Sequence, residues 1–527
     1  ISPEKEIIDI LTSDKKIIAF DSKKLRYYLL KWGVETESIV FDTVLAAYVL
    51  NSAKGSYNYD DIAIDWLNTD FPTEEILFGK GKSKTAFIFA DKIQFTAFSA
   101  RHSEVAWKSY EILNKKIKEN EQEFLYYNIE LPTAEVLSSM ETYGIKADRE
   151  SLVEYDNELT KNIEVLKSTV YALAGEEFNI NSPQQLGKVL FENLGLKGGK
   201  KTKTGYSTAA DVLDKIKSKH PVVEKVLNYR TLTKLKSTYC DGLLNVMDKK
   251  TGRIYSTFNQ TITSTGRLSS TEPNLQNIPV RTELGRLLRK VFVPEPGFLF
   301  VDADYSQIEL RILAHMSGDE NMINAFKNGD DIHTLTASQV HGISLSGVTP
   351  KMRSEAKAVN FGIVYGIGAF SLSDDLGITV KEAENYINAY LTKYANVRQF
   401  MTDSVNFAKE TGYAKTMYNR RREITELKSP NFNTRSFGER AAMNMPIQGS
   451  AADIMKLAMI RVFKRLKYEG LKSRIILQVH DEILVETAED ERDIVCSLVK
   501  EEMEAAATLM VPITADVNIG RNWYDTK

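Results

Sequence analysis

The chain has 527 residues, of which 43% are hydrophobic and 26% charged, so its length predicts several domains and its composition an ordinary globular protein. This composition excludes a fibrous, a disordered and a disulfide-stapled protein, and two cysteines, Cys240 and Cys496, fit a reducing compartment. No apolar run approaches the roughly 18 residues that span a bilayer, so we expect no membrane partner. The first residues, ISPEK, contain neither a Met nor an apolar signal core. We expect a fragment of a longer protein without a targeting signal.

Charge is nearly balanced overall and unevenly distributed. There are 68 basic and 71 acidic residues, a net charge of −3, which argues weakly against a nucleic-acid partner. Residues 196–240, however, carry 11 Lys or Arg against 3 Asp or Glu. A solvated surface and an arm that binds a nucleic-acid duplex both fit this local excess.

Taken in chain order, the hydrophobic pattern predicts an α/β protein of several domains. Residues 1–125 mix strand-like runs, at 16–20 and 85–89, with helices, and a charged helix over 111–127 leads out of this unit. Long amphipathic helices are predicted over 151–244, interrupted by an exposed basic loop at 195–205. From residue 254 onward, short strands alternate with helices, and no internal repeat is present.

Acidic residues follow two apolar strands. Residues 298–301 (FLFV) run into an acidic segment that contains Asp304, and a helical pattern follows over 307–315. A lone Asp there could be a helix N-cap. Residues 474–485 (RIILQVHDEILV) form a second site, where two β runs place Asp481 and Glu482 at a tight turn. Carboxylates gathered in this way could hold Mg²⁺, and two such ions are the general solution to phosphoryl transfer.

Residues 351–366 (KMRSEAKAVNFGIVYG) predict a helix with an unusual face. Two cations and two aromatic residues recur every four positions: Arg353, Lys357, Phe361 and Tyr365. A triphosphate on the cations and a base on the aromatic rings would explain this stripe, and a salt-bridged surface with a separate aromatic contact is the alternative. Gly362 and Gly366 predict a small-residue surface that a base pair could approach.

Six motifs in order extend over nearly the whole chain and resemble those of family A DNA polymerases. The three polymerase motifs lie at 304–311 (DYSQIELR), 353–365 (RxxxKxxxFxxxY) and 478–482 (QVHDE). Three further motifs lie at 263–267 (TSTGR), 273–279 (PNLQNIP) and 440–453 (RAAMNMPIQGSAAD). The resemblance implies an α/β multidomain fold, a right-hand polymerase of palm, fingers and thumb preceded by an RNase H-like exonuclease-type domain. The implied parts are the exonuclease-like domain at 1–125, the thumb at 126–260, the palm at 261–312 and 436–527, and the fingers at 313–435.

The resemblance also implies a function and a set of site residues. The function is template-directed DNA synthesis in replication or repair, in which dNTPs are added to a primer 3′-hydroxyl and pyrophosphate is released. Asp304, Asp481 and the Tyr305 carbonyl would ligate two Mg²⁺ ions beside Glu482, and Lys357 would complete the catalytic group. The nucleotide would contact Gln307, Glu309, His333, Arg353, Lys357, Phe361 and Tyr365. Primer–template DNA would contact Arg267, Asn444, Gln448, His480 and the basic segment of the thumb.

Particular roles follow from the same resemblance. Arg353 and Lys357, assisted by His333, would bind the phosphates, Phe361 would stack on the nucleotide, and Tyr365 would lie near the templating base. Glu309 would pack against the sugar C2′ as a steric gate, with a salt bridge to a fingers residue as the alternative role. His315, at the end of the same helix, is expected to be a packing or capping residue.

The exonuclease pattern is broken in the first domain. The segment that should read N-L-K-Y-D is SKKLR, so Arg26 occupies the position of a metal-binding Asp. A later Asp position falls near Arg101, His102 and Ser103, and the leading D-x-E motif would lie upstream of Ile1. Cations at these positions would repel Mg²⁺, so we expect a remnant scaffold without 3′→5′ proofreading.

Two other functions remain possible from the sequence. A single-subunit RNA polymerase shares the metal-binding acids, although Glu309 as a sugar gate argues against it. A catalytically inactive DNA-binding subunit is less compatible with the presence of Asp304, Asp481, Arg353 and Lys357 together. We expect a monomer in the bacterial cytoplasm whose partners are primer–template DNA and dNTPs.

Overall fold

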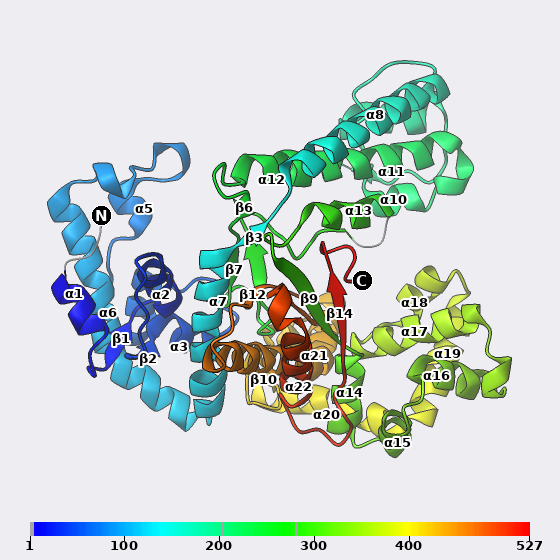
Figure 1. Cartoon of the computed structure of the whole chain (residues 1–527). Coiled ribbons are helices and arrows are strands. Elements are labelled where there is room, and N and C mark those ends of the chain that lie inside the picture. Colours follow the sequence, from blue (N-terminus) through cyan, green and yellow to red (C-terminus); the bar gives the residue numbers. More distant parts are fainter. Residues whose placement is uncertain (1–4, 203–204, 280–282) are drawn as a thin grey trace. The chain divides into compact units, whose positions relative to one another are not determined.

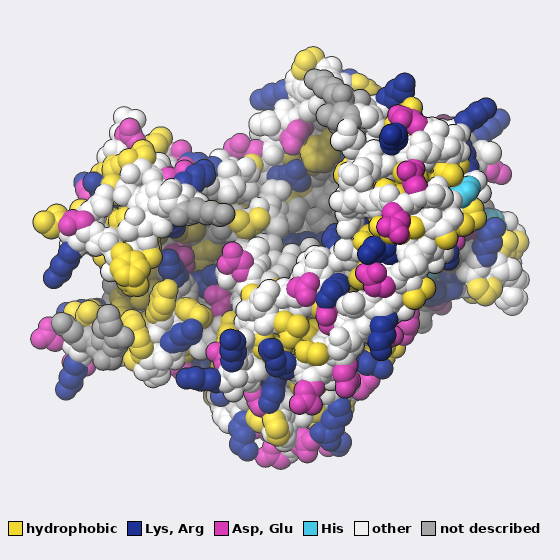
Figure 2. All heavy atoms as spheres, turned by 90° about the horizontal axis from the view of Figure 1, so that it is seen from above, with side chains coloured by type: hydrophobic (Ala, Val, Ile, Leu, Met, Phe, Trp, Pro, Cys, Tyr) yellow, Lys and Arg dark blue, Asp and Glu magenta, His cyan; other side chains and the backbone are white. Residues whose placement is uncertain are grey.

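The computed structural model describes residues 5–202, 205–279 and 283–527, which form two compact units (Figure 1). One unit comprises residues up to 143, 257–271 and 301–519, and the other comprises 144–256, 272–300 and 520–527. Within the described ranges, no helix combines the length and the apolarity needed to cross a membrane. Basic and acidic side chains are interspersed over the face drawn in Figure 2, as the balanced composition predicts.

The first unit begins with a small α/β domain. Strands β1 (Ile17–Ala19) and β2 (Ile39–Asp42) are parallel, as expected when a crossover helix joins two strands. Its core includes the buried residues Phe41, Tyr48, Tyr59 and Tyr126. Its helices are α1 (Lys5–Leu11), α2 (Ser22–Lys31), α3 (Thr43–Leu50), α4 (Tyr59–Leu67), α5 (Glu74–Phe78) and α6 (Lys92–Glu119).

One predicted strand in this domain is wrong. The run at 85–89 contains a 3₁₀ turn, η2 (Phe87–Phe89), in place of a strand. Ile88 and Phe89 are exposed, and only the Phe87 ring packs inward, with its centroid 5.2 Å from that of Phe78. A short apolar run has no period that separates a strand from a turn, and here no neighbouring strand pairs with it in the described structure.

A four-stranded sheet lies at the centre of the first unit, in the order β12 (Arg474–Val479), β13 (Glu482–Ala488), β9 (Phe298–Tyr305) and β14 (Ala515–Gly520). Strand β9 is buried except for the half-buried Phe298 and the exposed Asp304. The long helix α21 (Phe432–Tyr468) contacts β12 and packs against α22 (Arg492–Glu504). A hairpin of β10 (Tyr413–Lys415) and β11 (Arg421–Glu423) also packs on α21.

A group of helices in this unit contains the helix predicted at residues 351–366. That helix is confirmed as α17 (Pro350–Val364), which begins at a Thr349 cap followed by proline at its first position. It packs against α14 (Ile308–Ser317), α16 (Ile332–His341) and α18 (Ala369–Leu376). Helices α15 (Glu320–Asn328), α19 (Val380–Lys393) and α20 (Ala395–Thr411) pack in turn against these three helices.

The second unit is mainly helical, as predicted for residues 151–244. Helix α8 (Arg149–Ala174) packs against α11 (Pro221–Lys234) around a core that includes Val170, Leu190 and Val226. The shorter helices are α9 (Pro183–Lys188), α10 (Ala210–Asp214), α12 (Asp241–Val246) and α13 (Glu283–Leu287). The predicted basic loop at 195–205 is largely exposed and contains a short pairing of β4 (Lys201–Thr202) with β5 (Gly205–Tyr206). Residues 203 and 204 of this loop lie outside the described residues.

Candidate active site

The two predicted acid clusters lie side by side. Strands β12 and β13 form the predicted hairpin, and its tip consists of His480, with φ of +53°, and Asp481. The Tyr305 amide of β9 donates to the Asp481 carbonyl over 3.0 Å. Asp304, the exposed residue of a buried strand, therefore lies beside Asp481, and the sheet brings together two acids that are far apart in the sequence.

The acids of this cluster carry more negative charge than the nearby Arg267 offsets. Burial first, and then the carboxylates of Glu309, Asp304 and Glu482, raise the pKa of Asp481 to about 7, whereas Arg267 opposes them. No group of three or more His, Cys, Asp or Glu side chains in the described ranges forms a complete metal cage. Two carboxylates and a backbone carbonyl instead fit Mg²⁺, which usually takes one or two protein carboxylates and completes its shell with water and substrate phosphates.

Glu309 is part of an ion pair at the edge of these acids. It lies in the first turn of α14 and is 4% exposed, and its Oε1 accepts a hydrogen bond from Arg267 Nη2 over 2.6 Å. Burial, followed by the nearby Glu309 carboxylate, raises the pKa of the Tyr365 hydroxyl to about 12. The structure thus joins a predicted sugar gate, a predicted DNA contact and a predicted template-side residue in one cluster.

The predicted stripe on α17 is present on its outer face. Arg353 and Lys357 are exposed, Phe361 is half-buried, and Tyr365 caps the helix. Arg353 is paired, because its Nε donates to Asp331 Oδ2 over 2.6 Å. Lys357 is therefore exposed to solvent on the same helix face as Arg353, which is already paired with Asp331.

His333 lies behind this stripe. It is buried, its Nδ1 lies 2.9 Å from Asn360 Nδ2, and its ring centroid is 5.8 Å from that of Phe361. Burial, with smaller contributions from the nearby cations Arg353 and Lys357, lowers the pKa of His333 to about 4, and the Asp331 carboxylate opposes this shift. At neutral pH this imidazole is uncharged, so it could assist a phosphate only through a hydrogen bond.

The predicted small-residue surface beside the aromatic residues is wrong. A Cβ at Gly362 would lie 2.7 Å from Ile367 Cγ2, and one at Gly366 would lie 2.9 Å from Met443 Cε. The chain itself fills this space, because α17 ends in a tight turn that packs against α21. The absent side chains allow close packing within the protein.

The other predicted site residues surround the acids. Asn444 Nδ2 lies 3.5 Å from the Val364 carbonyl and Gln448 is half-buried, both on α21. His480 is exposed at the hairpin tip, and its carbonyl accepts a hydrogen bond from Gln478 Nε2, a contact that the sequence did not predict. Glu482 is buried at the start of β13.

Two residues flank helix α14. Gln307 precedes it with a φ of +57°, a strained conformation for a residue with a side chain. His315 in its last turn accepts a hydrogen bond from the Met510 amide over 3.2 Å, which agrees with its predicted packing role.

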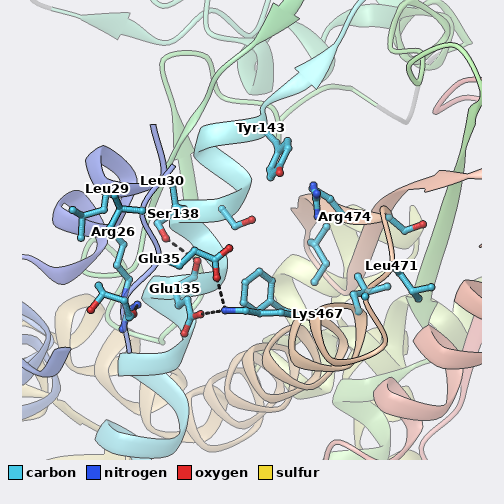
Figure 3. A pocket seen from close by; sticks show the side chains of 18 residues that line it. Arg26, Leu29, Leu30, Glu35, Glu135, Ser138, Tyr143, Lys467, Leu471 and Arg474 are labelled. Atoms are coloured by element: carbon cyan, nitrogen blue, oxygen red, sulfur yellow. Dashed lines mark hydrogen bonds and ion pairs between the residues drawn. The ribbon is translucent and has the colours of Figure 1, made fainter. Parts of the chain in front are cut away.

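Arg26 and His102, at the positions where the resemblance implies exonuclease acids, are packed into the N-terminal domain. Arg26 Nη1 donates to the Thr36 carbonyl over 2.6 Å, and Arg26 lines a cavity of about 270 Å³ (Figure 3). The same cavity contains the ion pair of Lys467 with Glu35, which joins this domain to α21. His102 lies within 4.8 Å, centroid to centroid, of the rings of Phe20, Tyr59 and Phe98.

Two family models match different parts of the chain. The family model described as DNA polymerase family A matches residues 149–525, and the one described as DNA polymerase I, ribonuclease H-like domain, matches residues 3–108. Curated relatives named DNA polymerase I are 47% identical over 99% of the chain in Caldicellulosiruptor bescii and 48% over 97% in Geobacillus stearothermophilus. The chain spans only 59% and 58% of those relatives, respectively.

A solved structure is also similar along the entire chain. The polymerase domain of Pol1 from M. smegmatis, in complex with DNA primer-template and dNTP, superposes with a TM-score of 0.89 at 38% identity. The match covers 100% of this chain and 90% of that one.

Proposed function

The chain belongs to DNA polymerase family A and has an N-terminal RNase H-like domain, and on that premise we propose that it catalyses template-directed DNA synthesis. The substrates are dNTPs and a primer 3′-hydroxyl, and the product besides DNA is pyrophosphate. One observation carries this proposal: the pairing of β9 with the β12–β13 hairpin, which sets Asp304 beside Asp481.

In this proposal Asp304, Asp481 and the Tyr305 carbonyl hold two Mg²⁺ ions, with Glu482 beside them. Such ions, when bound, lower the pKa of the attacking hydroxyl and offset charge on the triphosphate. The Tyr305 side chain supports this geometry from behind, because its hydroxyl donates to the Met503 carbonyl over 2.7 Å. Each carboxylate is thereby held on a rigid strand or a tight turn.

The face of α17 binds the nucleotide in the same proposal. Lys357 and Arg353 contact the phosphates, and Phe361 stacks on the sugar and base. A triphosphate would compete with Asp331 for Arg353, since the two now form an ion pair. Gln307 and the neutral His333 supply polar contacts, and Tyr365 borders the templating base.

DNA is bound by two sets of residues. Arg267, Asn444, Gln448 and His480 follow the primer-terminal base pair, and the basic segment at 196–240 contacts the duplex backbone. The division into palm, fingers and thumb, a monomeric state and a cytoplasmic location belong to the same proposal.

The N-terminal domain has no proofreading activity in this proposal. The support is the packing of Arg26 and His102, which fill the positions expected of metal-binding carboxylates. Asp42 is likewise occupied, because its carboxylate accepts hydrogen bonds from the Ser22 and Leu45 amides and caps α3.

Primer extension with Asp304→Asn and Asp481→Asn tests the proposed activity. Each variant should retain at most a few per cent of nucleotide incorporation, while duplex affinity stays within a few-fold because cationic contacts to phosphates dominate it. Asp516→Asn, on the neighbouring strand β14 and exposed, is the matched control and should extend normally. Robust extension by either active-site variant would contradict the two-metal assignment, and ribonucleotide use by the unmodified protein would favour the RNA polymerase alternative.

A further inference from the structure

The loop at residues 263–267 carries Arg267 into the active site. Thr263 Oγ1 donates to the Arg267 carbonyl over 2.6 Å and closes the loop on itself. The Arg267 guanidinium then reaches Glu309. Its position therefore depends on the backbone of this short segment, since no regular helix or strand contains it.

Two hydroxyl groups from the N-terminal domain hold that backbone. The Tyr48 hydroxyl, on α3, donates to the Thr263 carbonyl over 2.8 Å. Ser52 Oγ, just after α3, lies 3.3 Å from the Ser264 carbonyl oxygen and 3.0 Å from that of Arg421. Tyr48 is fully buried and Ser52 is 4% exposed, so water does not readily replace either contact.

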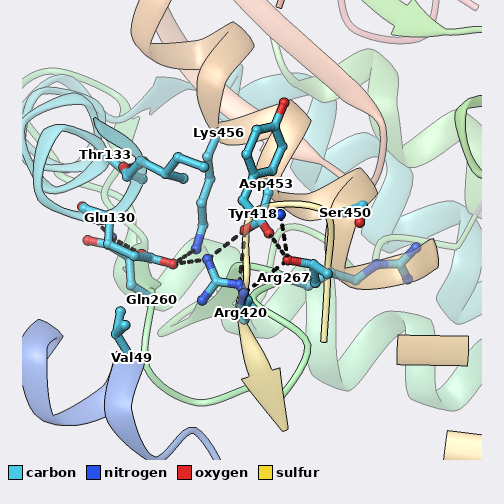
Figure 4. A network of polar contacts seen from close by, with 12 residues as sticks. Val49, Glu130, Thr133, Gln260, Arg267, Tyr418, Arg420, Ser450, Asp453 and Lys456 are labelled. Atoms are coloured by element: carbon cyan, nitrogen blue, oxygen red, sulfur yellow. Dashed lines mark hydrogen bonds and ion pairs between the residues drawn. The ribbon is translucent and has the colours of Figure 1, made fainter. Parts of the chain in front are cut away.

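A buried cluster of charges also contacts the loop (Figure 4). A Cβ at Gly266 would lie 2.5 Å from Arg420 Nε, so the guanidinium packs directly on the loop. Arg420 pairs with Glu130 and also donates to Asp453 Oδ1, over 2.9 Å from Nε and 2.6 Å from Nη2. Lys456 donates to Glu130 over 2.7 Å and thereby balances two acids with two bases.

The four buried charges of this cluster hold one another in place. All four of its side chains are at most 1% exposed. Removing one partner from a buried ion pair would leave an uncompensated charge, which is strongly destabilising. The loop is thus contacted by the Arg420 guanidinium and by the hydroxyl groups of Tyr48 and Ser52.

We propose that the N-terminal domain acts as a positioning element for synthesis: Tyr48 and Ser52 fix the 263–267 loop so that Arg267 meets the primer terminus. This inference rests on the proposed function, because it takes Arg267 as a primer contact. It assigns to the domain a role that needs none of the carboxylates of an exonuclease. Tyr48 and Ser52 are positioning residues, since both act through the loop backbone.

Conservative substitutions test this role. Tyr48→Phe removes a single hydroxyl and should slow single-turnover incorporation about fivefold, the equivalent of one hydrogen bond, with the dNTP dissociation constant unchanged. Tyr57→Phe is the matched control, because its ring packs edge-on against that of Tyr48, with centroids 5.8 Å apart, whereas its hydroxyl donates to the Asn51 carbonyl and not to the loop. It should leave the rate within about twofold of the unmodified protein.

A double-mutant cycle separates positioning from general stability. In an Arg267→Ala background, Tyr48→Phe should cause no further loss of rate, whereas any effect on the melting temperature should persist. Equal rate losses for Tyr48→Phe and Tyr57→Phe, or a full Tyr48→Phe effect without Arg267, would overturn the proposal. A normal incorporation rate in Arg267→Ala would also overturn the proposal, although the proposed DNA synthesis itself would not be contradicted. Failure of the proposed function is recognised separately, by activity that survives Asp304→Asn.

Discussion

Replacing Glu309 by alanine separates its two roles, the ion pair seen in the structure and the proposed sugar gate. Glu309→Ala removes both the carboxylate and the stem that would border C2′. Glu309→Gln keeps a side chain of nearly the same volume and removes only the charge. The two variants therefore differ in the space beside the sugar and share the loss of the Arg267 ion pair.

The ion pair affects stability by a modest amount. It is a charge-assisted hydrogen bond of 2.6 Å, whose loss costs about 1.5–3 kcal/mol in general. The Arg267 side chain is 33% exposed and can bind water once its partner is gone, so we expect the lower end, about 1.5 kcal/mol, in Glu309→Ala. The loss should be smaller in Glu309→Gln, whose amide oxygen can still accept a hydrogen bond from Arg267.

Sugar selection should change only where the stem is removed. Crowding of a ribose hydroxyl acts on the difference between two transition states, so its relief favours the ribonucleotide selectively. Glu309→Ala should raise the efficiency of rNTP relative to dNTP incorporation at least tenfold, about 1.4 kcal/mol of lost discrimination. Glu309→Gln should stay within about threefold of the original ratio.

Single-nucleotide kinetics with matched dNTP and rNTP measure this ratio directly. An unchanged ratio in Glu309→Ala, even with both rates reduced, would leave Glu309 as a purely structural partner of Arg267. An equal increase in both variants would assign selection to the charge and refute the steric reasoning.

Three further predictions concern proofreading, the nucleotide stripe and pH. A labelled primer should not be shortened in Mg²⁺ without dNTPs, because Arg26 and His102 replace carboxylates; EDTA-sensitive, protein-dependent shortening would show that other acids bind the metals. Lys357→Ala should weaken the dNTP concentration dependence and slow transfer through loss of a point charge, and Phe361→Ala should weaken dNTP binding through lost stacking with duplex affinity unchanged. Unaltered dNTP dependence in both variants would make α17 a structural helix. The folded-state pKa of His333, about 4, is below its ordinary 6.5, so the unfolded chain binds the proton more tightly and stability is lost as pH falls from about 6.5 to 4. In urea unfolding, the loss of unfolding free energy between about pH 6.5 and 4 should be up to about 3 kcal/mol smaller in His333→Gln than in the unmodified protein. Identical pH slopes in the two proteins would contradict this assignment.

The parts of the site that the sequence predicts have short-range signals. The hairpin that ends at Asp481 follows from two β runs separated by a turn, and α17 follows from a four-residue repeat of cations and aromatic rings. The pairing of Asp304 with Asp481 could be expected because both acids follow buried strands. The hairpin and α17 are each specified by a window of about 15 residues, whereas the approach of Asp304 to Asp481 depends on sheet pairing between distant segments.

The parts that the sequence does not predict depend on tertiary contacts. Arg267 and Glu309 were assigned to different ligands, and only the structure shows that they bind each other. Gly362 and Gly366 indicated open space, although their neighbours come from a following turn and from α21. Glu130 and Arg420 carry no local signal of burial, because they are buried together by segments almost 300 residues apart in the sequence.

The fully buried Glu130 and the half-buried Asp481 have opposite pKa shifts, and the contrast explains how charge is divided between support and chemistry. Burial alone would raise the pKa of Glu130, but the cations of Lys456 and Arg420 outweigh it and hold that pKa near 2. Asp481 has no comparable partner: Arg267 is shared with Glu309, and the neighbouring carboxylates add to the burial. A compensated cluster is rigid and supports the loop, whereas an undercompensated one gains most from a divalent cation. Burying a carboxylate charge is costly. At Glu130 cations offset this cost, which suits a structural residue, and at Asp481 they do not, which suits a metal ligand.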